Sequence, residues 1–162
     1  MSNALAGYIE SEAIAIKAKA TSSEEVIRLL AARLEKLGYV RPSYAEAVLA
    51  REAHMPTGLP MGRDSNVAVP HTDPEHVLKP GIALAILENP VVFANMEDPQ
   101  EAVPVGLVFM LALNDKDKQI EMLQQIMLTI QDEDLSNRLL NTTNSAEALA
   151  LLNGAQHGDN PK

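Results

Sequence analysis

Residues 81–87 read Gly-Ile-Ala-Leu-Ala-Ile-Leu, and residues 103–113 read Val-Pro-Val-Gly-Leu-Val-Phe-Met-Leu-Ala-Leu. Both stretches are nearly continuous apolar runs. A strand that faces solvent on one side alternates apolar and polar residues, whereas a strand covered on both faces stays apolar along its length. The two runs therefore predict central strands of a sheet with helices on both faces.

The segments around these runs predict the remaining elements. Residues 13–18 alternate loosely and predict a first strand, whereas residues 67–70 predict a short strand that Pro70 ends. Residues 55–66 have the composition of a loop. Apolar residues at helical spacing predict helices over 22–37, 42–54, 116–131, 134–141 and 145–153. This order predicts an α/β fold, a single-domain sandwich with a mixed central β-sheet flanked by helices on both faces.

Two details predict how particular helices begin and which side they bury. Ser22-x-x-Glu25 and Ser43-x-x-Glu46 match the capping box, in which a serine and a glutamate satisfy free amides at a helix start. The long helix predicted from about Lys116 to Gln131 has an apolar stripe formed by Ile120, Leu123, Met127 and Ile130. We expect this stripe to face the core.

Length and composition bound the class of protein. The chain has 162 residues, which predicts one domain, with an ordered core over about 5–153 and a flexible tail over 154–162. The 13 Lys and Arg residues against 22 Asp and Glu give a formal net charge of −9, and aromatic residues make up 3%. Such a chain lacks the basic stripe and the stacking surfaces that nucleic-acid binding needs. We therefore predict no nucleic-acid partner.

Further absences from the sequence exclude other classes. The chain has no cysteine, which excludes disulfides, thiol nucleophiles and cysteine-bound metal. No apolar run approaches the ~20 residues of a membrane span, and no signal peptide is recognisable. We therefore predict no membrane insertion and a cytoplasmic location.

Two residues are candidates for chemistry. His71 follows a short strand and a proline, and sites in α/β proteins favour the carboxyl ends of strands. An imidazole at such a place can act as a base, a metal ligand or a nucleophile, and it is equally compatible with a partly exposed loop histidine. Arg51 lies on the apolar face of its predicted helix, where a guanidinium can pair with a carboxylate or bind a phosphate.

Motifs for other chemistries are weak or missing. His71-x-Asp73-x-x-His76 contains ligands that zinc accepts, but Pro74 interrupts the segment and no fourth ligand is evident. A metal-dependent hydrolase using His71, Asp73 and His76 remains the alternative from another functional class. The sequence contains no G-x-S-x-G, G-x-G-x-x-G or G-x-x-x-x-G-K-[ST] motif. We predict neither a cofactor nor a bound metal.

A resemblance to a known family narrows these possibilities. The residues that carry it are Ala50-Arg51-Glu52, Pro56-Thr57-Gly58, Val67-Ala-Val-Pro-His71, Ile82–Leu87, Pro90-Val-Val-Phe93, Val105–Leu113 and Ile120-Glu-Met-Leu123. Together they resemble the fructose–mannitol class of enzyme IIA domains of the bacterial sugar phosphotransferase system. The resemblance extends from about residue 13 to residue 153.

The resemblance implies a phosphocarrier with a phosphohistidine intermediate. His71 would accept phosphate from the phosphocarrier protein HPr and pass it to an enzyme IIB partner. Arg51 falls on the active-site arginine of the family and would stabilise the phosphoryl group. Thr57 and loop amides would donate to the phosphoryl oxygens, and Glu52, His76 and Gln119 are candidate supporting residues around the site.

Three departures from the mannitol type favour the galactitol-type branch. The loop between Arg51 and His71 is longer than in mannitol-type members, and His76 lies five residues after His71. Gln119 stands where the mannitol type carries a second active-site histidine. The sequence leaves two roles open within this family: phosphate relay for sugar or polyol uptake, and a nitrogen-regulatory type of enzyme IIA that acts through protein binding.

Overall fold

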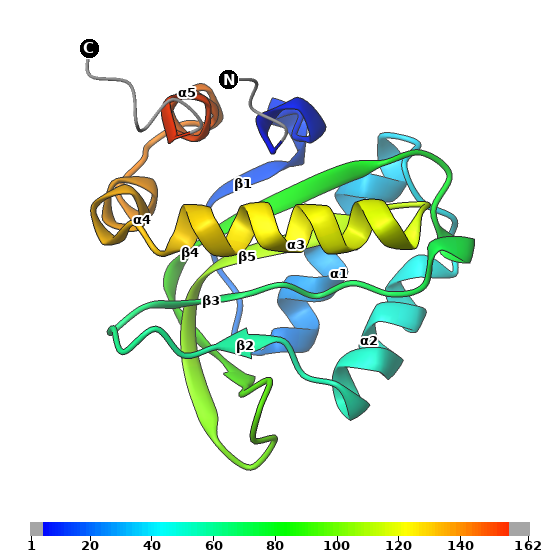
Figure 1. Cartoon of the computed structure of the whole chain (residues 1–162), viewed down its shortest axis with the longest axis horizontal. Helices are drawn as coiled ribbons and strands as arrows, with labels where there is room; N and C mark the ends of the chain where they lie inside the picture. The colour runs from blue at the N-terminus through cyan, green and yellow to red at the C-terminus, as the bar shows by residue number, and fades with distance from the viewer. Residues whose placement is uncertain (1–4, 156–162) are drawn as a thin grey trace.

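Five strands form one mixed sheet in the order β1-β4-β5-β3-β2 (Figure 1). The structure is a computed structural model that describes residues 5–155. Its strands are β1 (Ile14–Ala18), β2 (Gly58–Leu59), β3 (Asn66–Ala68), β4 (Gly81–Ala94) and β5 (Ala102–Ala112). β1 runs parallel to β4 and β3 runs parallel to β5, whereas β4–β5 and β2–β3 are antiparallel. The predicted mixed sheet is therefore confirmed.

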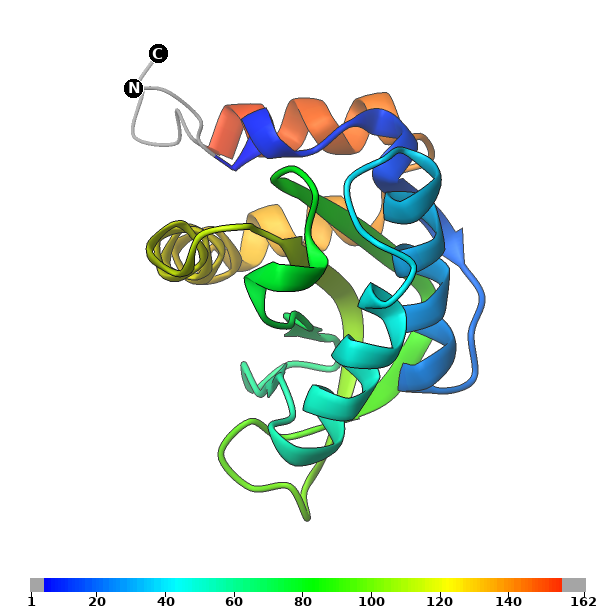
Figure 2. The same cartoon turned by 90° about the vertical axis from the view of Figure 1, so that its right-hand side faces the viewer.

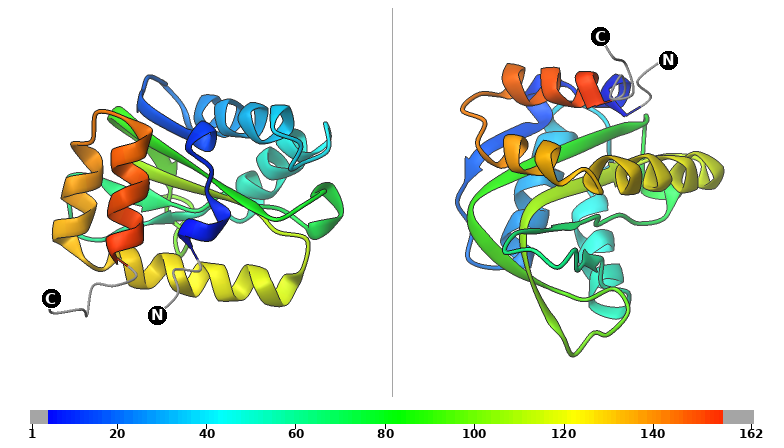
Figure 3. Two further views of the ribbon diagram at one scale, coloured as in Figure 1. Left: turned by 90° about the horizontal axis from the view of Figure 1, so that it is seen from above. Right: turned by 60° about the vertical axis from the view of Figure 1, so that its left-hand side comes forward.

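Helices cover both faces of this sheet (Figure 2). One face carries α1 (Ser23–Lys36) and α2 (Tyr44–His54). The other carries α3 (Lys116–Ile130), α4 (Glu133–Leu140) and α5 (Ser145–Ala155), with α4 and α5 together at one end (Figure 3). Three short 3₁₀ helices complete the described chain: η1 (Ala6–Tyr8), η2 (Ser11–Ala13) and η3 (Pro74–His76). The α/β sandwich predicted from the sequence is confirmed.

The strand β4 shows why the apolar runs are continuous. Ala83, Ala85 and Leu87 pack in the core under α1 and α2. Ile82, Leu84 and Ile86 pack in the second core, under α3, α4 and α5. Alternate side chains of a strand point to opposite faces, and here both faces are covered. Each fully buried aliphatic side chain contributes ~1.5–3 kcal/mol of hydrophobic free energy, so these two cores are the main source of stability.

Several predicted strand bounds are wrong for identifiable reasons. β4 continues past Pro90 to Ala94. The strand tolerates Pro90 because residues 88–90 are exposed and lie where the register with β5 is irregular, between Ile86 and Val91. A proline at such a place breaks no hydrogen bond between the strands, although it lacks an amide hydrogen. The predicted loop 55–66 contains β2, where a Cβ on Gly58 would lie 2.5 Å from the Ala94 carbonyl oxygen. Only a glycine allows this close approach of backbones.

The predicted apolar stripe of α3 is only partly confirmed, since Ile130 is buried and Leu123 packs against the core, whereas the other two stripe residues are exposed. The buried residues of α3 are Met122, Ile126, Thr129 and Ile130. Ile120 is 56% exposed and Met127 is 37% exposed, although both belong to the predicted stripe. The helix carries apolar residues on two sides, and periodicity alone does not decide which of them packs on the sheet.

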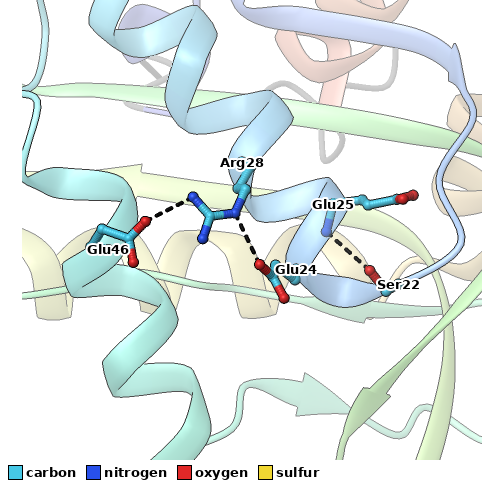
Figure 4. A network of polar contacts seen from close by, with 5 residues as sticks. All are labelled: Ser22, Glu24, Glu25, Arg28 and Glu46. Carbon is cyan, nitrogen blue, oxygen red and sulfur yellow. Dashed lines mark hydrogen bonds and ion pairs between the residues drawn. The ribbon is translucent and has the colours of Figure 1, made fainter.

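The serine bond of the first predicted capping box forms, with the glutamate shifted to the preceding amide, and the second box does not form. The Ser22 hydroxyl accepts a hydrogen bond from the Glu25 amide at 3.2 Å, and the Glu25 carboxylate accepts from the Thr21 amide at 2.7 Å. Ser43 makes no cap bond, because its hydroxyl pairs with Nδ1 of His76 at 2.8 Å. Figure 4 shows the start of α1, where Arg28 also bonds to Glu24 and to Glu46 and so connects α1 with α2.

The end of the chain differs slightly from the prediction. α5 extends through Gly154 to Ala155, so the predicted helix end at residue 153 is two residues too early. Most of the predicted flexible tail, residues 156–162, lies outside the described residues.

Candidate active site

His71 lies just beyond the carboxyl end of β3, beside the neighbouring strand β5. It forms an isolated parallel bridge with Leu111, whose amide donates to the Pro70 carbonyl at 3.1 Å. The side chain is not a loose loop histidine, since His71 is only 8% exposed. The backbone on both sides of the imidazole is thus held by the sheet.

A backbone carbonyl determines which imidazole nitrogen carries the proton. Nδ1 of His71 lies 2.9 Å from the Val69 carbonyl oxygen. A carbonyl oxygen only accepts hydrogen bonds, so Nδ1 carries the hydrogen and Nε2 keeps its lone pair. This tautomer makes Nε2 the nucleophilic nitrogen.

The surroundings of His71 keep the imidazole neutral. Burial lowers its pKa below the usual histidine value, because a charged ring would lose its hydration. The Arg51 guanidinium lowers the pKa further, whereas the Val69 carbonyl and the Asp73 carboxylate oppose the shift without reversing it. A neutral ring at neutral pH is the form that can attack an electrophile.

Arg51 lies in the last turn of α2, next to the segment that follows His71. Its Nη1 is 4.0 Å from a carboxylate oxygen of Asp73, and its side chain is 34% exposed. Its Nε is buried and has no hydrogen-bond partner within residues 5–155. A guanidinium with a buried, unpaired donor and a loose carboxylate contact has capacity to bind a further anion.

A tyrosine that the sequence analysis did not assign to the site fastens α2 to the strand beside His71. Tyr44 is fully buried, and its hydroxyl donates to the Leu111 carbonyl at 2.6 Å. Burial raises the pKa of Tyr44 well above its usual value, so the hydroxyl stays protonated. The bond holds the helix that carries Arg51 against the residue that pairs with His71. The feature of the sequence that could have indicated this role is the hydroxyl of Tyr44 on the apolar face of a predicted helix.

Thr57 does not present a free hydroxyl to a phosphoryl group, which differs from the expectation. Its amide and its hydroxyl both donate to the Glu52 carboxylate, each at 2.9 Å. Hydrogen bonds to an ionised carboxylate are stronger than those between neutral groups. In this structure Thr57 and Glu52 are therefore hydrogen-bonded to each other.

The other two expected residues, Gln119 and His76, make different contacts. Gln119, in the first turn of α3, donates from Nε2 to the Thr72 carbonyl at 3.1 Å and so reaches the residue after His71. His76 instead bonds to Ser43, and its Nε2 lies 3.5 Å from a carboxylate oxygen of Glu75. Within the described residues, no three His, Cys, Asp or Glu side chains are grouped so that they could hold a metal ion.

Comparisons with known proteins identify the family of this chain. A sequence profile of the family described as "Phosphoenolpyruvate-dependent sugar phosphotransferase system, EIIA 2" matches residues 8–155. The chain belongs to this family. It is thus an EIIA 2 domain, a phosphotransferase component, and the fructose–mannitol class indicated by the sequence is confirmed.

Relatives of this EIIA 2 domain include mannitol-specific and galactitol-specific components. The mannitol-specific EIICBA component of Escherichia coli K12 is 34% identical over 147 residues, which are 89% of this chain and 22% of that protein. This chain therefore spans about a fifth of that relative. The mannitol-specific enzyme IIA component of Halalkalibacterium halodurans is 29% identical over 89% of this chain and 93% of its own. The galactitol-specific EIIA component of E. coli O6:H1 is 28% identical over 72% of this chain and 76% of its own.

A solved relative also shares the fold of this EIIA 2 domain. It is described as a complex of enzyme IIAMTL and phosphorylated enzyme IIBMTL from E. coli. It matches with a TM-score of 0.72 and 32% identity, over 90% of this chain and 99% of that chain. Within residues 5–155, none of the helices has both the length and the apolar character required to cross a bilayer.

Proposed function

We propose that this EIIA 2 domain relays phosphate through His71 in the uptake of a sugar or polyol. His71 accepts the phosphoryl group from phospho-HPr and passes it to an enzyme IIB partner. The observation that carries this proposal is the neutral, Nδ1-protonated tautomer of His71, with Arg51 near enough to lower its pKa. The relative solved with phosphorylated enzyme IIB supports the choice of acceptor.

The transfer step requires no cofactor. The Nε2 lone pair of His71 attacks the phosphorus in line with the bond to the donor, and a new P–N bond forms. The bond between phosphorus and the donor atom breaks, and its electron pair stays with the donor. The proton stays on Nδ1, which donates it in a hydrogen bond to the Val69 carbonyl throughout. Because the protein supplies mainly position and charge, one nucleophile and one guanidinium are sufficient for this chemistry.

The phosphoryl group adds about two negative charges beside Arg51. The guanidinium is planar and its Nε has no partner within residues 5–155, so it can form new bonds to phosphoryl oxygens. Onward transfer to enzyme IIB uses the same groups: the P–N bond to Nε2 of His71 breaks, its electron pair stays on Nε2, and the phosphorus bonds to the acceptor of enzyme IIB.

Exposed apolar side chains next to the site favour protein partners. Met55, immediately after α2, is 57% exposed, and Ile120 follows Gln119 at the start of α3. Such residues suit the dry centre of a protein interface. We propose HPr and enzyme IIB as the partners, a substrate of the mannitol or galactitol type, and a cytoplasmic location, which suits a chain without cysteine.

The alternatives gain no support from the geometry. The hydrolase hypothesis needs His71, Asp73 and His76 around one metal, but the His76 ring is bonded to Ser43, and the residues that the structure describes contain no group of three such side chains able to hold a metal. The nitrogen-regulatory hypothesis involves the same phosphohistidine. It differs from the uptake role in that enzyme IIB does not become phosphorylated.

Incubation with phospho-HPr and candidate enzyme IIB proteins distinguishes the uptake role from the regulatory role. Label on His71 that never reaches an enzyme IIB favours the regulatory role.

Chelation should leave the transfer unchanged. We expect phosphate to pass from pre-formed phospho-HPr to this protein at the same rate with and without excess EDTA, because the nucleophile and the counter-charge are side chains. The measurement is the labelling rate after phospho-HPr has been separated from its own magnesium-containing reaction. A stoichiometric bound metal, together with loss of transfer on chelation, would support the hydrolase hypothesis instead.

The pH dependence should reflect the lowered pKa of His71. A lowered pKa means that the folded protein resists protonation of the ring, so Nε2 stays available as pH falls through the usual histidine value of about 6.5. We expect the acid limb of the labelling rate to lie below that value. An NMR titration of the His71 ring separates its protonation from that of the donor. A ring pKa at or above about 6.5 would show that burial does not control the nucleophile.

A further inference from the structure

We propose that Glu52 is a positioning residue for His71, an inference that rests on the proposed function. Its carboxylate holds Thr57, and Thr57 in turn holds the strand end whose Val69 carbonyl selects the imidazole tautomer. No part of Glu52 needs to touch the phosphoryl group for this role.

The first link joins α2 to the start of β2. Glu52 is half-buried in the last turn of α2 and accepts both the amide and the hydroxyl hydrogen of Thr57. Thr57 is only 3% exposed, and its neighbours Pro56 and Gly58 are also buried. The Glu52 carboxylate therefore closes the turn between α2 and β2 by accepting from both donors of Thr57.

The second link joins β2 to the nucleophile. The Thr57 carbonyl accepts from the Val69 amide at 3.3 Å, as β2 and β3 pair in antiparallel fashion. The carbonyl of the same Val69 accepts from Nδ1 of His71 at 2.9 Å. A shift of Thr57 would move Val69, and a shift of the Val69 carbonyl would release the ring tautomer. The path from Glu52 to the imidazole thus contains three consecutive hydrogen-bonded contacts.

The unfavourable burial of the Glu52 carboxylate indicates that this residue has a role other than stabilising the fold. Burial raises the pKa of its carboxyl group, and the two Thr57 bonds and Arg51 only partly offset this effect. An ionised carboxylate that is partly desolvated destabilises the fold relative to an apolar residue of similar size. Glu52 also follows Arg51 directly, so a single turn of α2 provides both the counter-charge and the anchor of the loop.

The test compares two carboxylates on the same helix. Glu52→Ala removes the anchor, and Glu46→Ala removes a carboxylate that bonds to Arg28 on the outer side of α2. We expect Glu52→Ala to show a mixture of His71 tautomers in ¹⁵N NMR spectra and labelling from phospho-HPr that is slower by roughly 10-fold, as expected for a displaced nucleophile. Glu46→Ala should retain the tautomer and the rate of the unmodified protein.

Two further variants separate positioning from general stability. Glu52→Gln keeps the volume and one acceptor, so it should recover most of the rate, whereas a rate as low as that of Glu52→Ala would contradict the hydrogen-bonding role. Thr57→Val removes only the hydroxyl bond and should give an intermediate rate and tautomer mixture. An unchanged tautomer and rate in folded Glu52→Ala, or in Thr57→Val if the alanine variant does not fold, would overturn the inference.

The tautomer measurement uses this protein alone and is therefore independent of the proposed function. If Glu52→Ala alters the tautomer but the unmodified protein accepts no phosphate, the inference about Glu52 holds and the proposed function fails. If the unmodified protein accepts phosphate and Glu52→Ala changes nothing, the inference alone fails.

Discussion

His71→Ala should accept no phosphate from phospho-HPr and should remain folded. The substitution removes the only nitrogen proposed to attack the phosphorus, while the hydrogen bond lost is the one to Val69. A carbonyl left without that partner costs ~1–3 kcal/mol, which a domain of this size tolerates. The measurement is labelling with phospho-HPr, followed by thermal melting of the same sample. The label on the unmodified protein should be stable to alkali and labile to acid, as a phosphoramidate is.

His54→Ala is the matched control, because it removes an exposed histidine from the last turn of the neighbouring helix. We expect that variant to be labelled normally. Phosphate that persists on His71→Ala would reject His71 as the nucleophile and direct attention to the other histidines.

Arg51→Ala should slow transfer by at least ~10-fold, equivalent to roughly 1.4 kcal/mol of barrier, with little effect on melting. Its pairing with Asp73 spans 4.0 Å between partly exposed groups, a contact worth little to folding. Arg51→Lys keeps the charge but loses the planar fork, so we expect only partial recovery. The rate of labelling by phospho-HPr and the melting temperature are the two readouts.

Arg28→Ala provides a second cation for comparison, since Arg28 also contacts α2 but bonds to Glu24 and Glu46. It should leave transfer unchanged. Normal transfer in Arg51→Ala would remove the guanidinium from the site, and loss of folding would make it a structural ion-pair partner.

Much of the fold follows from local chemistry that the sequence displays. The continuous apolar runs at β4 and β5 predict a sheet covered on both faces, because nothing polar interrupts either side. Where the local sequence is compatible with two arrangements, it does not predict which of them forms. α3 has apolar residues on two sides, and the sheet contacts select Met122 and Ile126 over Ile120. Ser43 has a good cap pattern, yet the imidazole of His76 competes for its hydroxyl.

Some features of the candidate site could likewise be predicted from the sequence, whereas others depend on the folded structure. The proline-histidine pair after a strand and the position on the helix make His71 and Arg51 candidates, and the family resemblance favours them over the other possibilities. The tautomer depends on the Val69 carbonyl, a backbone group that no side-chain pattern reveals. The contact between Glu52 and Thr57 arises only once the turn after α2 closes, which makes the direction of the threonine hydroxyl unpredictable from spacing.

The most direct test of the account is the position of the phosphate on ¹⁵N-labelled protein. After incubation with phospho-HPr, ³¹P–¹⁵N coupling identifies the nitrogen that bears the phosphoryl group. We predict coupling to Nε2 of His71, with Nδ1 still protonated toward Val69. Coupling to Nδ1 of His71, or to a nitrogen of any other histidine, would contradict the account.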